Sequence, residues 1–131
     1  MDTLVSIFHS PFCDIAEAEH FLRCAVGPGR PQEIQECYRA LAAECLLRKG
    51  KSLLIVGASG GGDSFVHLAG RDSLRAIALA GVPPEFRLAL VARDADMIAV
   101  YDAAVVEAAR HGIVARRFQS EQQAAAWLLA P

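Results

Sequence analysis

The sequence of 131 residues has neither a long apolar run nor a run of basic residues longer than a pair. Every apolar stretch is shorter than the roughly 18 residues that a membrane-spanning helix needs, so no span is predicted. The apolar run at 4–8 is too short for a secretory signal, so a cytoplasmic protein is expected. A net charge of −2 also leaves the chain without the positive surface that nucleic-acid binding requires.

The four cysteines include no Cys-x-x-Cys pair; they stand at positions 13, 24, 37 and 45. His9 and His20 each precede a cysteine by four residues, but no further donors cluster near them, and zinc sites use closer spacings. Cys37 and Cys45 lie on the apolar stripe of a predicted helix, where a free cysteine acts as a small hydrophobe. We therefore expect reduced, mostly buried thiols, no bound metal and no cofactor.

The chain also lacks repeats, linkers and low-complexity tracts, and 53% of its residues are hydrophobic. This composition predicts one globular domain over residues 1–131. Residues 4–8 alternate and are rich in β-branched and aromatic side chains, which predicts a strand. The segment 15–26 is ambiguous: its apolar spacing suits a helix, and part of it would also suit a strand.

From residue 31 onward, helices and strands are predicted to alternate. Pro31 suits a first helical position, and Gly50, Gly81 and Gly112 suit helix ends. Residues 52–56 are apolar on both faces, as a central strand covered on both sides would be. Predicted helices cover 31–48, 64–80 and 95–111, a short helix follows the capping residue Ser120, and predicted strands cover 52–56, 86–92 and 113–118.

This alternation predicts an α/β fold with right-handed crossovers. The expected architecture is a mixed, largely parallel sheet of four to five strands, flanked by about four helices.

The stretch IVGASGGGDS, residues 55–64, places a Gly-rich loop between a predicted strand and helix. It fits Gly-x-x-x-x-Gly-x-Ser, but Asp63 stands where a phosphate-binding loop carries the lysine that contacts the phosphates. Asp63 is more typical of a helix N-cap, and an NTPase is therefore disfavoured. Ser59 comes near the Gly-x-Ser-x-Gly pattern of hydrolases, but no suitable acid and histidine follow it, so no catalytic residue is predicted. The three glycines indicate backbone freedom or the close approach of a ligand.

The second half of the chain resembles a known family. The carriers of the resemblance are the strand LALVA, the helix with Tyr101, the segment HGIVARRF and a closing Ala-x-x-Trp-Leu helix, over about residues 50–129. In these features the chain is similar to the STAS domain, and more closely to compact bacterial proteins of the SpoIIAA-like (STAS/SEC14-type) group.

The resemblance implies a small mixed sheet whose N-terminal segment adds edge strands, and a non-enzymatic regulatory or protein-interaction module. Family members dock through the loop and helix after the strand that corresponds to 52–56, where a serine can be phosphorylated. The family motif reads Asp-Ser-Ser/Thr-Gly; Asp63 and Ser64 match its start, whereas Phe65 and Val66 depart from it. In the family the second hydroxyl residue of the motif is the modified one, and Phe65 takes that position here. Ser64 is the candidate phosphorylation site only if the helix begins a residue earlier, and Phe65 is a candidate partner contact.

A protein partner is therefore the first expectation, and a homodimer through a sheet edge or helix face is a further one. The alternative is a small-ligand domain whose loop amides hold a nucleotide, an anion or a lipid head group. Both alternatives use the same predicted site, which consists of Gly57, Ser59, Gly60, Gly61, Gly62, Asp63, Ser64 and Phe65.

Overall fold

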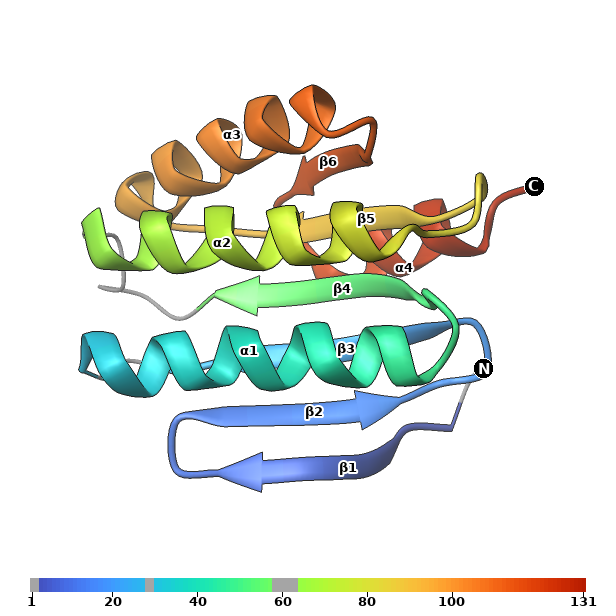
Figure 1. Ribbon diagram of the computed structural model, residues 1–131, viewed down its shortest axis with the longest axis horizontal. Coiled ribbons are helices and arrows are strands. Elements are labelled where there is room, and N and C mark those ends of the chain that lie inside the picture. The colour runs from blue at the N-terminus through green and yellow to red at the C-terminus, as the bar shows by residue number, and fades with distance from the viewer. Residues whose placement is uncertain (1–2, 28–29, 58–63) are drawn as a thin grey trace.

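The structure is a computed structural model that describes residues 3–27, 30–57 and 64–131. Six strands form one mixed sheet in the order β1-β2-β3-β4-β5-β6, and four helices pack on it (Figure 1). The strands are β1 (Val5–Ser10), β2 (Cys13–Glu17), β3 (Phe21–Val26), β4 (Ser52–Gly57), β5 (Arg87–Val91) and β6 (Val114–Phe118). The helices are α1 (Pro31–Leu47), α2 (Ser64–Ala80), α3 (Ala95–Arg110) and α4 (Glu121–Leu129).

The strand number corrects the sequence-based expectation of four to five. The ambiguous segment contains two strands, because β2 pairs antiparallel with both β1 and β3. A turn closed by the amide of Ala18, which donates to the carbonyl of Phe21 at 2.9 Å, separates β2 from β3. Ile15, Leu22 and Cys24 are fully buried, as an alternating strand pattern requires.

The helix-bearing half follows the predicted order. Strands β3 to β6 are mutually parallel and adjacent in sequence order. Right-handed crossovers that step in one direction along a sheet place every connecting helix on the same face. Figure 1 accordingly shows α1, α2 and α3 together on one face, while α4 lies behind the sheet.

The sheet therefore has two hydrophobic cores. The larger joins the inner faces of α1, α2 and α3 to the sheet, with Tyr38, Leu53, Leu88 and Tyr101 among its buried members. The smaller lies under α4. Its members are Ala18, Phe21, Leu54, Ala89, Val91, Phe118, Ala124 and Leu128.

Predicted helix ends agree with the structure where they can be compared. Asp94 caps α3 by accepting a hydrogen bond from the Met97 amide at 2.9 Å, and Ser120 caps α4 through the Gln123 amide. Among the described residues, no helix has both the length and the apolar character to cross a bilayer.

Leu22→Ala is expected to lower the free energy of unfolding by about 2–5 kcal/mol, because the leucine is fully buried in the larger core. Leu79→Ala is the matched control: its side chain is 82% exposed, and a change below about 0.5 kcal/mol is expected. Urea denaturation followed by circular dichroism measures both. Equal effects of the two substitutions would contradict the assignment of the core.

Candidate functional site

The Gly-rich stretch follows the end of β4 and precedes α2, as the sequence predicts. Gly57 is the last residue of β4, and Ser64 and Phe65 open α2, where the structure describes their backbone. The other predicted site residues, Ser59 with Gly60, Gly61, Gly62 and Asp63, lie outside the described residues. Of the eight candidates, Gly57 is thus the one whose surroundings the structure describes.

Gly57 packs closely against side chains of α3. A Cβ at this position would lie 2.7 Å from Met97 Cε and 2.8 Å from Tyr101 Oη, both on α3. Real Cβ atoms do not approach other atoms so closely, so the end of β4 rests directly on α3. The close approach of a ligand is predicted for Gly60, Gly61 and Gly62, which lie outside the described residues. At Gly57 the close neighbour is the protein's own helix α3.

Tyr101 also pairs with Tyr38 of α1. The two hydroxyl oxygens are 3.5 Å apart, and both side chains are buried. Burial raises the pKa of Tyr38 to about 12, against a hydrogen bond from Tyr101 that lowers it. Burial, together with the neighbouring Tyr38, raises the pKa of Tyr101 well above its ordinary value. Both phenols are therefore neutral, and either can donate to the other.

Beside the tyrosine pair is a small apolar cavity of about 50 Å³. It lies between α1, α2, α3 and the strands β4 and β5, with Leu74, Ile77 and Val100 among its lining residues. An engineered apolar cavity that binds benzene has about 150 Å³. The cavity accordingly admits guests the size of a few water molecules, and a larger ligand requires the helices to move.

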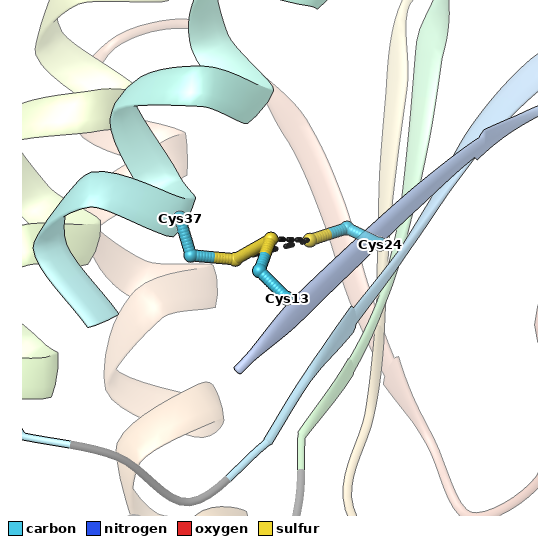
Figure 2. Close-up of side chains that lie close together, drawn as sticks. All are labelled: Cys13, Cys24 and Cys37. Carbon is cyan, nitrogen blue, oxygen red and sulfur yellow. Dashed lines mark hydrogen bonds between the residues drawn. A yellow bond between two sulfur atoms is a disulfide. The ribbon is translucent and has the colours of Figure 1, made fainter. Parts of the chain in front are cut away.

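Three cysteines form a second feature of the same core. Cys13 of β2 and Cys37 of α1 form a disulfide, and the Sγ of Cys24 on β3 lies 4.0 Å from that of Cys13 and 3.7 Å from that of Cys37 (Figure 2). The expectation of four free thiols is thus wrong for Cys13 and Cys37. The expectation that the cysteines are buried is confirmed, because none of the four is more than 3% exposed.

Strand register explains why these sulfurs meet. Cys13 pairs with Val26, and Ile15 pairs with Cys24, on adjacent antiparallel strands. Side chains two residues apart share a face of a strand, so Cys13 and Cys24 both point toward α1. Sequence reasoning missed this cluster because it left 15–26 undecided and therefore had no register. The alternation of Cys13, Ile15, Leu22 and Cys24 was the signal that could have found it.

The fourth cysteine lies apart from the cluster. The Sγ of Cys45 donates to the Lys51 carbonyl at 3.4 Å, beyond the end of α1. Burial raises the pKa of Cys24 to about 12 and that of Cys45 to about 11, so both are neutral thiols near pH 7. The disulfide closes a loop between residues 24 apart in sequence, which by chain entropy stabilises the fold by about 3 kcal/mol.

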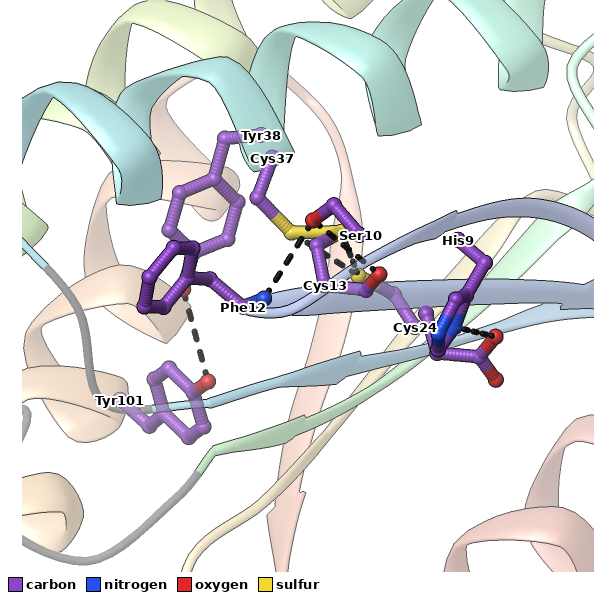
Figure 3. The surroundings of a disulfide bond; sticks show 9 residues. His9, Ser10, Phe12, Cys13, Cys24, Cys37, Tyr38 and Tyr101 are labelled. Atoms are coloured by element: carbon purple, nitrogen blue, oxygen red, sulfur yellow. Dashed lines mark hydrogen bonds and ion pairs between the residues drawn. A yellow bond between two sulfur atoms is a disulfide. The ribbon is translucent and has the colours of Figure 1, made fainter.

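The disulfide and the tyrosine pair adjoin each other through α1 (Figure 3). Cys37 and Tyr38 are consecutive residues on the inner side of that helix. Figure 3 shows the disulfide and the Tyr38–Tyr101 bond side by side beneath α1. The two features therefore form one buried region that reaches from β2 to α3 and ends at Gly57.

Several polar side chains outside this region have structural partners. His9 is 3.3 Å from Asp14 on an exposed face, and His111 is 3.3 Å from Glu107. Glu17 pairs with Lys51 and Arg48, and the hydrogen bond from Lys51 is the main cause that lowers its pKa.

Comparison with known proteins adds no identification: no family model, curated protein or solved structure matches the chain. The resemblance to the STAS family therefore stays a prediction.

Gly57→Ala is expected to lower the free energy of unfolding by about 1–3 kcal/mol, because the new methyl group must displace Met97 and Tyr101. Gly27→Ala is the matched control, since a Cβ there meets its nearest neighbour, the Phe12 carbonyl oxygen, at an ordinary 3.5 Å. Combining Gly57→Ala with Tyr101→Phe, which removes the clashing hydroxyl, should recover part of the loss in urea denaturation. Additive costs of the two changes would argue against this contact.

The chain has only two tyrosines, and both are buried. Absorbance at 295 nm should stay constant in the native protein up to about pH 11, whereas the urea-unfolded chain titrates near pH 10. Folding raises the pKa of both tyrosines, because burial favours the neutral phenol. The contribution that the neutral tyrosines make to folding stability is complete below about pH 10 and is lost as pH rises above it. Native tyrosines that titrate near pH 10 would contradict their burial.

Proposed function

We propose that the chain is a non-enzymatic regulatory or protein-interaction module, the role that the STAS resemblance implies. We further propose that a partner docks by adding an extended strand to the free edge at β1. The observation that carries this proposal is the difference between the two edges of the sheet.

The β1 edge lacks the charged side chains of Asp, Glu, Lys and Arg, since residues 3–10 contain none of these four residue types. Leu4 is 46% and Val5 60% exposed, and β1 is the outermost strand on its side of the sheet in the part of the chain that the structure describes, paired with β2. An exposed edge strand offers unpaired backbone groups to another strand, and natural proteins blunt such edges with charge, proline or bulges. The bulge between Ser6 and Phe8 is the only such device within β1.

The β6 edge is protected by charge. Arg117 forms an ion pair with Asp102 of α3 at 2.6 Å, and the Arg116 guanidinium lies over the Phe118 ring. Two arginines on a five-residue strand make the approach of a second strand unfavourable. The contrast supports β1 as the edge at which strand addition takes place, a recognition mode in which backbone hydrogen bonds supply the affinity.

The loop at 57–66 is the docking surface that the family resemblance implies, and it remains part of the proposal as a separate contact. Ser64 opens α2, where the partial positive charge of a helix N-terminus favours a phosphate group. Phosphorylation of Ser64 would add about −1.5 to −2 charge to this surface.

A small-ligand domain is the second candidate function. The observation that favours it is the apolar cavity next to two neutral phenols, since ligand sites combine apolar walls with a few placed polar groups. A thermal-shift panel of small apolar molecules tests the cavity, and nucleotides, phosphates and lipid head groups test the loop. A rise in melting temperature that Tyr38→Phe abolishes would support this alternative, and a flat response would contradict it.

Val5→Lys is expected to abolish partner capture, because it places a charge on the edge strand where a partner strand must pair. The tagged protein and its variants are used in pull-downs from the native cell extract, and the captured proteins are identified by mass spectrometry. Val106→Lys is the matched control on α3, since Val106 is similarly exposed at 56%. It should leave capture unchanged.

Phe65→Ala separates the two docking surfaces. If Val5→Lys keeps the partner and Phe65→Ala loses it, strand addition at β1 is wrong and the loop is the docking surface. If neither change affects any captured protein, the interaction module itself is contradicted. Light scattering of the purified chain shows whether the partner is a second copy.

A further inference from the structure

The cluster of Cys13, Cys24 and Cys37 contains one cysteine more than a structural disulfide needs. All three sulfurs lie within 4.8 Å of one another, and they form the only group of three or more potential metal ligands in the part of the chain that the structure describes. They come from β2, β3 and α1, so the fold itself gathers them. A disulfide uses two of these residues and leaves Cys24 as a third thiol in contact with both.

The spacing of the sulfurs suits three-coordinate ligation. Three sulfurs each about 2.3 Å from one ion lie roughly 3.5–4 Å apart, depending on how far the ion sits out of their plane. The Sγ of Cys24 already lies 4.0 and 3.7 Å from the other two. Once the disulfide opens, Cys13 and Cys37 have to separate only to ordinary contact distance to complete the triangle.

The surroundings decide which ion fits. Among the residues whose side-chain burial the structure describes, which leaves out 64–70, no charged residue is buried, so these residues supply no buried cation to balance a negative complex. Three thiolates with Cu(I) would carry a charge of −2 and with Zn²⁺ a charge of −1, and an unpaired buried charge is strongly unfavourable. Zinc sites also use four ligands, and this cluster supplies three. A trivalent ion with three thiolates is neutral.

We propose that the reduced cluster of Cys13, Cys24 and Cys37 is a binding site for one trivalent thiophilic ion, with arsenite as its probe. A dithiol or phosphine reductant first supplies two electrons, and with two protons it converts the disulfide to two thiols. Arsenous acid then exchanges its three hydroxyl groups for three sulfurs. Each thiol proton leaves with a hydroxyl as water, so three As–S bonds form and no charge is created in the core. This site is independent of the docking surface at β1.

The reduced full-length chain is incubated with arsenite and measured by native mass spectrometry. We expect one arsenic atom per chain, with loss of three hydrogens, and no arsenic on the oxidised chain. Cys24→Ala should weaken binding at least tenfold because it removes one of the three ligands. Cys45→Ala, which removes a buried thiol outside the cluster, should bind arsenite as the unaltered chain does.

Thiol alkylation keeps the test decisive if Cys24→Ala does not fold. After arsenite treatment of the unaltered reduced chain, Cys13, Cys24 and Cys37 should be protected from iodoacetamide while Cys45 reacts on partial unfolding. Protection of only two cysteines, equal binding by Cys24→Ala, or displacement of arsenite by equimolar Zn²⁺ or Cu(I) would each overturn the proposal.

Discussion

The packing of α1 against the sheet is the contact on which the rest of the structure depends. Its inner side carries Cys37 to the disulfide with β2, Tyr38 to the hydroxyl of Tyr101 on α3, and Cys45 to the Lys51 carbonyl before β4. Helix α1 thus joins the hairpin of β1 and β2, the parallel pair of β3 and β4, and helix α3, against which Gly57 packs. The burial of its apolar stripe is what keeps these contacts in register.

The sequence was sufficient for the parallel half of the fold. From Pro31 onward, each element has a clear period and a recognisable end: Gly50, Gly81 and Gly112 all adopt positive φ after helices, as predicted. The hairpin of β2 and β3 could not be predicted with the same certainty. Its apolar residues satisfy helical and alternating spacing alike, and only the pairing with β1 and β4 decides between them.

The sequence predicts where the candidate site lies in the fold, but not which side chains meet there. The strand-to-helix position of the loop follows from local pattern, and Gly57 lies where the pattern puts it. The tyrosine pair and the cysteine cluster join residues 63, 24 and 13 positions apart in the chain. Such contacts depend on strand register and on the side of the sheet that each helix covers, and neither can be obtained from residue spacing alone. A similar limit applies to the two edges of the sheet. The residue spacing does not show that β1 and β6 are the outermost strands, so it cannot show how the two edges differ.

The two faces of the sheet carry different natural chromophores. The only tryptophan, Trp127, belongs to α4, where its ring lies tilted against Phe118 and beneath the Arg87 guanidinium, while both tyrosines lie on the opposite face. Tryptophan fluorescence therefore reports the detachment of α4, and tyrosine signals report the three-helix face. Without any added label, one unfolding experiment can show whether the two cores melt as a single cooperative unit or one before the other.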